Sequence, residues 1–183
     1  MSGIPHHRRG QVRVRCFAIL TMAAMVSTAL AADAIVGRHP DSVVRARVVE
    51  LVNAARARGR MCGDEHFAAA PPLQAVRPLD EAAASLAHDM ARRKYFDHRA
   101  ADGSQPRERV LRAGYQSKLT GENIAFGPTS AEEVVAGWLG SPGHCANIMD
   151  TRFQHIGVGL ATGKKRGHIY WVQDFGAPLR RNP

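Results

Sequence analysis

The spacing of apolar residues changes along this chain, and that change constrains the fold more than any other feature. In the first three quarters, apolar residues recur at helical intervals, as Val44, Val48 and Val52 do. From residue 156 they alternate with glycine and alanine, and a second apolar run follows at residues 169–175. Helices therefore come first and two paired strands come last, without strand–helix alternation. The pattern predicts an α+β fold in which helices cover an antiparallel sheet.

Capping residues and turn signals predict where these elements begin and end. Asp41 or Ser42 and then Asp80 can cap two long helices, and Ser130 with Glu133 forms a capping box for a later one. The expected helices span about 41–58, 80–94, 106–113 and 130–138. Residues 59–78 are expected to form a turn-rich connection, and residues 163–167 a basic turn between the two strands.

The N-terminus has the pattern of an export signal. Four arginines precede an apolar run at residues 16–31, and no acidic residue occurs before Asp33. The run is short for a span of about 20 residues, and Ala29-Leu30-Ala31 suits a signal peptidase. We therefore expect a signal peptide at 1–31, a short leader at 32–40, one domain at 41–178 and a basic tail at 179–183. An uncleaved membrane anchor is the alternative.

Removal of this signal peptide lowers the net positive charge of the chain. The formal net charge falls from +9 to +5 because four arginines and no acids leave. The remaining lysines and arginines are scattered, which argues against nucleic-acid binding and favours at most a weak attraction to anionic envelope surfaces. We expect a secreted or periplasmic protein that is monomeric and has no membrane span after cleavage.

Cleavage would leave two cysteines, Cys62 and Cys145, in an oxidising compartment. One disulfide between them is the simplest prediction. The alternative is that Cys145, next to His144, is a reactive thiol.

Three residues in short glycine- or turn-bearing contexts form the candidate site. They are His98 after the second helix, Glu122 between Gly121 and Asn123, and His144 after a Ser-Pro-Gly turn. Imidazoles and a carboxylate suit a divalent metal such as zinc, or a general base held by hydrogen bonds. Their spacing alone is no zinc signature.

The order of several motifs resembles the CAP superfamily of cysteine-rich secretory, antigen 5 and pathogenesis-related-1 proteins, in its bacterial branch. The resemblance covers roughly residues 45–176. It rests on Asn53-Ala-Ala-Arg56, Ala87-His-Asp-Met90, Tyr95-Phe-Asp-His98, Gly121-Glu-Asn-Ile-Ala125, Trp138-Leu-Gly-Ser-Pro-Gly-His144, Ile156-Gly-Val-Gly159 and Tyr170-Trp-Val-Gln-Asp-Phe175.

This resemblance implies a three-layer α-β-α sandwich with a surface cleft lined by two histidines and two acids. His98, Glu122 and His144 match three of those positions, and Asn123 and Ser141 lie beside them in the sequence. Ser141 stands where the second acid is expected, so the set is incomplete. The remaining residues could hold a metal as three ligands with one open position.

Three functions remain open at this level. The favoured one is a non-enzymatic binding module whose polar centre holds a metal or a polar group of a small molecule, a lipid, or an envelope or host component. The others are a structural envelope protein with a hydrogen-bonded cluster and a metal-assisted hydrolase.

Overall fold

The computed structural model describes residues 1, 36–37, 40–164 and 168–179. The expected signal peptide lies outside these residues except for Met1, as do most of the leader, part of the basic turn and residues 180–183 of the tail. Among the described helices, none has the length and apolar character needed to span a membrane.

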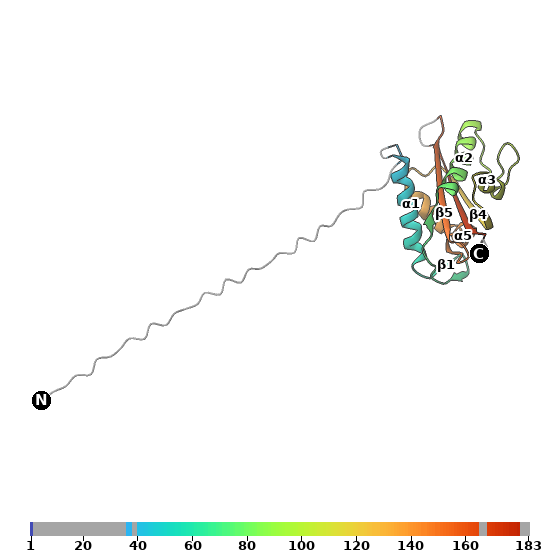
Figure 1. Ribbon diagram of the computed structural model, residues 1–183. Helices are drawn as coiled ribbons and strands as arrows, with labels where there is room; N and C mark the ends of the chain where they lie inside the picture. Colours follow the sequence, from blue (N-terminus) through green and yellow to red (C-terminus); the bar gives the residue numbers. More distant parts are fainter. Residues whose placement is uncertain (2–35, 38–39, 165–167, 180–183) are drawn as a thin grey trace. The chain divides into compact units, whose positions relative to one another are not determined.

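A four-stranded sheet forms the middle layer of the unit Ala32–Pro183 (Figure 1). Its order is β3 (Gln74–Ala75), β5 (His155–Thr162), β6 (Ile169–Pro178) and β4 (Ser117–Phe126). β3 pairs with β5 in parallel, and the other pairs are antiparallel. The hairpin predicted from the alternating pattern is therefore confirmed as β5 and β6, and the fold is the predicted α+β sandwich.

One layer of helices, α2 (Arg77–Arg93) and α3 (Pro106–Arg112), covers one face of the sheet. Contact with β5 is close because two glycines face α2. A Cβ at Gly157 would lie 2.1 Å from the Leu79 carbonyl carbon, and one at Gly159 would lie 2.2 Å from the Ala84 nitrogen. The alternation of glycine with large apolar residues thus lets the helix backbone rest on the sheet backbone.

The other layer consists of α1 (Asp41–Arg56), α4 (Ala131–Gly140) and α5 (Pro142–Met149). Its core includes Trp138, Trp171 and Phe175, which are at most 1% exposed. A small hairpin of β1 (Arg60–Cys62) and β2 (Glu65–Phe67) lies apart from the main sheet.

Several predicted boundaries were wrong. The first helix ends at Arg56, and the second begins at Arg77 because Pro78 fits the first turn of a helix. Asp80 does not cap it; its carboxylate instead accepts the Val158 N–H at 2.8 Å and ties α2 to β5. The region expected to be only a connection contains β1, β2 and β3.

Two motif contexts also differ from the prediction. The segment around Glu122 is not a turn but part of the ten-residue strand β4. The segment Ser-Pro-Gly-His is not a turn either, because Pro142 and the residues after it form the first turn of α5. The capping role of Ser130 is confirmed, since its hydroxyl accepts the Glu133 N–H at 3.1 Å, although α4 continues to Gly140.

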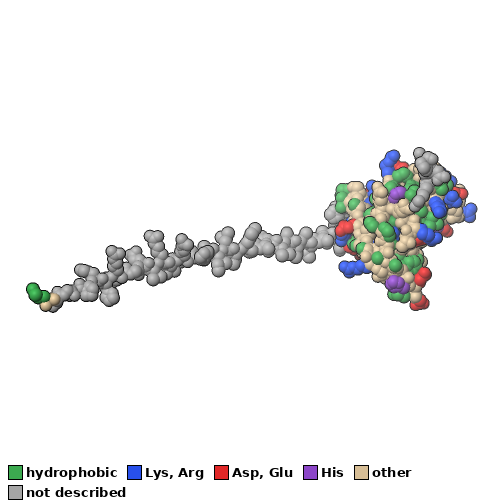
Figure 2. Space-filling view, turned by 60° about the horizontal axis from the view of Figure 1, so that its bottom comes forward, with side chains coloured by type: hydrophobic (Ala, Val, Ile, Leu, Met, Phe, Trp, Pro, Cys, Tyr) green, Lys and Arg blue, Asp and Glu red, His purple; other side chains and the backbone are tan. Residues whose placement is uncertain are grey.

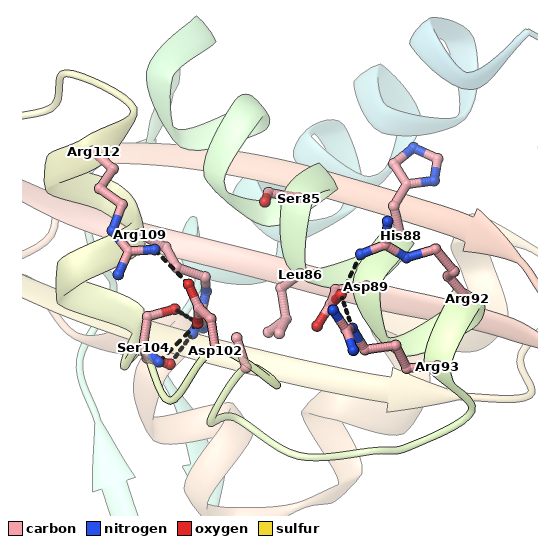
Figure 3. Close-up of a pocket in the computed structure, with 11 residues that line it drawn as sticks. Ser85, Leu86, His88, Asp89, Arg92, Arg93, Asp102, Ser104, Arg109 and Arg112 are labelled. Atoms are coloured by element: carbon pink, nitrogen blue, oxygen red, sulfur yellow. Dashed lines mark hydrogen bonds and ion pairs between the residues drawn. The ribbon is translucent and has the colours of Figure 1, made fainter.

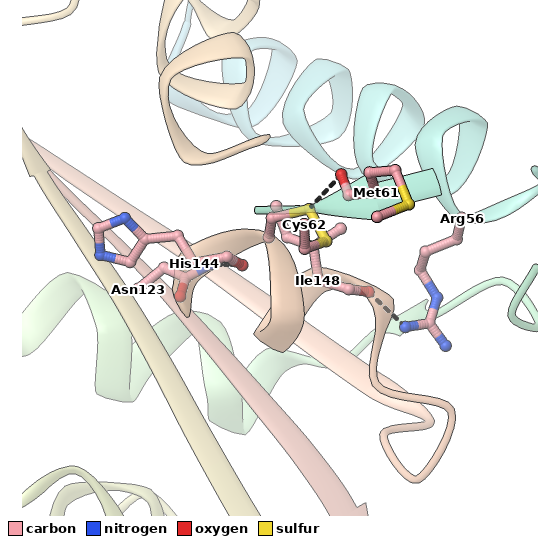
Figure 4. Close-up of a disulfide and its surroundings, with 7 residues drawn as sticks. Arg56, Met61, Cys62, Asn123, His144 and Ile148 are labelled. Atoms are coloured by element: carbon pink, nitrogen blue, oxygen red, sulfur yellow. Dashed lines mark hydrogen bonds between the residues drawn. A yellow bond between two sulfur atoms is a disulfide. The ribbon is translucent and has the colours of Figure 1, made fainter. Parts of the chain in front are cut away.

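Two features fix α5 in place (Figure 4). The predicted disulfide joins Cys62 of β1 to Cys145 of α5, with a Cα–Cα distance of 5.4 Å. On the other side, the fully buried Arg56 donates to the carbonyl oxygens of Ile148 at 2.5 Å and Asp150 at 3.0 Å. A guanidinium at the end of α5 suits the partial negative charge of a helix C-terminus.

Candidate functional site

The first pair of the site joins a loop to the edge strand of the sheet. His98 lies in the loop after α2, and Glu122 lies on β4. His98 Nδ1 and Glu122 Oε1 are 2.7 Å apart, while the side chains are 47% and 2% exposed, respectively. The buried carboxylate therefore holds a partly exposed imidazole by one ring nitrogen.

This contact changes the chemistry of the imidazole. The hydrogen bond that His98 donates to Glu122 raises the pKa of His98, and this outweighs the opposing effect of burial. Because Nδ1 is engaged, Nε2 is the ring nitrogen of His98 that is left for a further contact. Among the described residues, no hydrogen bond to this Nε2 is formed.

A third residue, Arg109 of α3, completes the environment of Glu122. Its Nη2 lies 2.5 Å from Glu122 Oε2, and its Nη1 donates to the Ser104 carbonyl at 2.8 Å. Arg109 is only 5% exposed. Sequence reasoning missed this residue, although its place within a short helix that begins at Pro106 puts it within reach of β4.

A second acid lies beneath the site, but not at position 141. Asp174 of β6 is opposite Glu122 in the strand register and is fully buried. Burial raises the pKa of Asp174, and the charge of Glu122 raises it further, whereas Arg109 opposes both effects. The neutral form avoids charge repulsion with Glu122, and among the described residues neither oxygen of Asp174 has a hydrogen-bond partner.

His144 approaches from the opposite helix layer, in the first turn of α5. The Asn123 side chain donates to its carbonyl oxygen at 3.1 Å, and Asn147 donates to Asn123 Oδ1 at 2.9 Å. Burial lowers the pKa of His144, and the nearby charge of His98 lowers it further. Within the described part of the chain, no hydrogen bond joins His144 to Glu122.

The residue Ser141 links α4 and α5. Its carbonyl oxygen accepts the Cys145 N–H at 2.8 Å, and its side chain does not cap α5. Its backbone therefore helps to position the helix that carries His144.

The three predicted residues do not fit a metal centre as three ligands. Both oxygens of Glu122 are already engaged, one by His98 and one by Arg109. In residues 40–164 and 168–179, no group of three or more His, Cys, Asp or Glu side chains is arranged to hold a metal ion. Glu122 is placed to orient His98 rather than to share a ligand with it.

Together these features define a three-layer α-β-α sandwich in which histidines from opposite layers approach a strand carrying a buried, arginine-bound glutamate. The chain belongs to the CAP family, described as the cysteine-rich secretory protein family, whose sequence pattern matches residues 49–175.

Two curated relatives come from Bacillus subtilis (strain 168). The uncharacterized protein YkwD is 37% identical over 134 residues, which cover 73% of this chain and 47% of that protein. The uncharacterized membrane protein YlbC is 30% identical over 103 residues, covering 56% of this chain and 28% of that protein. The chain thus spans less than half the length of either relative.

Solved structures show the same fold. An extracellular protein with an SCP domain from Bacillus anthracis str. Ames has a TM-score of 0.64 at 24% identity, covering 75% of this chain and 43% of that one. An outer surface protein from Borrelia burgdorferi has a TM-score of 0.58 at 20% identity, covering 76% of this chain and 92% of that one.

Proposed function

We propose that this protein is an exported, non-enzymatic binding domain whose ligand contacts the imidazoles of His98 and His144. The observation that carries the proposal is the hydrogen bond of 2.7 Å that His98 Nδ1 donates to Glu122 Oε1. It holds a partly exposed ring in one orientation, with Nε2 directed to a ligand. Such an arrangement is typical of a recognition group whose orientation is set before binding.

The two imidazoles offer different hydrogen-bonding groups. A raised pKa favours the protonated form of His98, in which Nε2–H is a donor. A lowered pKa favours neutral His144, which offers one donor and one acceptor. This combination suits a polar group rich in oxygen, such as a hydroxyl, amide or carboxylate.

Export is supported by the N-terminal pattern and by the described locations of similar structures, one extracellular and one on an outer surface.

The binding proposal can be tested on purified, oxidised protein labelled with ¹⁵N at its histidines. Sugars, polyols, short peptides and carboxylates are titrated in turn, and the ring resonances are followed. We expect a ligand to shift His98 and His144 together and to bind at least tenfold more weakly to His98→Ala and His144→Ala. The exposed His66 of β2, changed to alanine, is the matched control. Equal binding by all three variants would contradict the proposal.

Zinc provides a separate test of the metal alternative. Calorimetry should show at most weak binding, because two imidazoles remain when Glu122 is engaged by Arg109. Submicromolar binding that His144→Ala abolishes would restore the three-ligand prediction.

The structural and enzymatic alternatives make different predictions. The Glu122–Arg109 pair supports a structural role, and in that case Glu122→Gln lowers the melting temperature while no ligand moves the imidazole resonances. The His98–Glu122 pair is also the geometry of an oriented general base. Turnover of any ester, peptide or glycan in a broad panel, lost in His98→Ala, would favour the enzyme.

A further inference from the structure

A cavity separate from the imidazole pair lies between α2, the loop after it and α3 (Figure 3). Its volume is about 530 Å³, within the range of small-molecule sites. Its charged lining consists of four arginines and two aspartates: Arg92, Arg93, Arg109, Arg112, Asp89 and Asp102.

The buried arginine of this lining has an unused donor. Arg109 directs Nη1 to Ser104 and Nη2 to Glu122, but its buried Nε–H has no hydrogen-bond partner among the described residues. A buried charged donor without a partner costs on the order of 1–3 kcal/mol. The residue that carries this donor lines the cavity.

The rim of the cavity carries exposed positive charge. Arg92 and Arg93 share one oxygen of Asp89, each at 2.8 Å, so that one carboxylate faces two guanidinium groups. Burial by itself raises the pKa of Asp89, but hydrogen bonds from Arg92, Tyr95 and Arg93 lower it to about 2. The carboxylate is therefore ionised at neutral pH, and one positive charge remains unmatched at this rim.

The opposite rim carries Arg112, paired with Asp102 at 2.7 Å and 60% exposed. Figure 3 shows Arg112 and Asp102 facing Arg92 and Arg93 across the cavity. Even when Glu122 is counted as the partner of Arg109, the four guanidinium groups exceed the three carboxylates by one charge.

Figure 2 shows Lys and Arg side chains at several separate places on the visible face. General basicity therefore does not account for the cavity. What distinguishes it is a buried guanidinium, held by Ser104 and Glu122, in the same lining as exposed guanidinium groups.

We infer that this cavity binds a phosphate group, with Arg109 Nε–H on one oxygen and the arginines of the rim on others. A tetrahedral oxyanion has acceptors in several directions, whereas a planar carboxylate presents only two oxygens in one plane. The volume leaves room for an attached group the size of a sugar or polyol, so both free phosphate and a phosphorylated carbohydrate are sources of the same chemistry.

Calorimetry with inorganic phosphate, glucose 6-phosphate and glucose distinguishes these sources. We expect both phosphates to bind and neutral glucose not to bind. Tighter binding of the sugar phosphate would assign the rest of the cavity to the sugar, and equal affinities would assign the site to free phosphate. Binding of glucose as strong as that of glucose 6-phosphate would overturn the inference.

Variants test the assigned residues. Arg109→Lys keeps the positive charge but removes the Nε–H, and we expect it to weaken phosphate binding on the order of tenfold. Arg93→Gln and Arg112→Gln should each weaken it several-fold. Arg77→Gln is the matched control, because Arg77 is exposed on α2 and ion-paired with Glu81, outside the cavity.

The Nε–H resonance of Arg109 gives a test that does not depend on a variant that folds. Titration of the unaltered protein with inorganic phosphate should move this signal in step with the calorimetric saturation. A signal that stays in place at saturation, or unchanged affinity in both Arg93→Gln and Arg112→Gln, would contradict the site. His98→Ala should still bind inorganic phosphate, because Arg109 keeps its contact with Glu122 in that variant, and this separates the inference from the proposed function.

Discussion

At the scale of single residues, Glu122 sets the properties of His98. Its hydrogen bond raises the pKa of His98, while burial and the charge of His98 lower that of His144. The two imidazoles of one site are therefore expected to titrate on opposite sides of the ordinary histidine value of 6.5.

These shifts have opposite consequences for stability. A raised pKa means that the folded state binds the proton more tightly, so the contribution of His98 is complete below pH 6.5 and is lost as the pH rises through its folded pKa. A lowered pKa means that His144 reduces stability as the pH falls from 6.5 through its folded pKa.

We expect Glu122→Gln to lower the pKa of His98 because the charged acceptor is removed. A ¹⁵N titration of the ring nitrogens between pH 5 and 9 measures this directly, and Glu133→Gln, far along the chain on α4, serves as the control. A titration curve for His98 that is the same in Glu122→Gln and the unaltered protein would show that another group sets its pKa.

The sequence showed which side chains could form a site, but not which of them orients another. His98 and Glu122 were predicted as partners and lie in contact, since strand and loop bring them together. Their separate roles depend on Arg109, which no short motif marks. Asp174 had a detectable signal, because a charged residue inside an apolar strand is rarely buried without a reason.

At the scale of elements, the contact between α2 and β5 depends on missing side chains. We expect Gly159→Ala to destabilise the protein by about 3 kcal/mol, because the new methyl group overlaps the α2 backbone. Urea unfolding measures the loss.

The matched control is Gly137→Ala on α4, where a Cβ has no neighbour within 4 Å. Since glycine is unfavourable inside a helix, this variant should be more stable by roughly 0.5–1 kcal/mol. Similar destabilisation of both variants would show that the close approach at Gly159 is not what limits this position.

Elements with a clear periodicity of apolar residues or clear capping residues were predicted well, and elements defined by tertiary contacts were not. The β5–β6 hairpin and α4 follow from alternation and capping. By contrast, β3 has two residues and exists because Gln74 and Ala75 pair with β5. The helix α5 was mistaken for a turn because proline and glycine disfavour helix interiors, although proline is well suited to the first turn.

At the scale of the whole molecule, the disulfide connects segments that are 83 residues apart in the sequence. We expect Cys62→Ala with Cys145→Ala to lose about 2–4 kcal/mol, chiefly because the unfolded chain is no longer constrained. Urea unfolding under non-reducing conditions compares the two proteins. If two thiols of the unaltered protein react with an alkylating reagent when it is unfolded without reductant, the bridge is absent in solution.

The position of Arg109 has a consequence for the binding equilibria of the two proposed sites. Its Nη2 holds the carboxylate behind His98, and the same residue lines the cavity proposed to bind phosphate. A ligand at either proposed site that alters the Arg109–Glu122 contact also acts on the other site. Reciprocity then requires that any factor by which phosphate changes affinity at the imidazoles equals the factor by which the imidazole ligand changes affinity for phosphate.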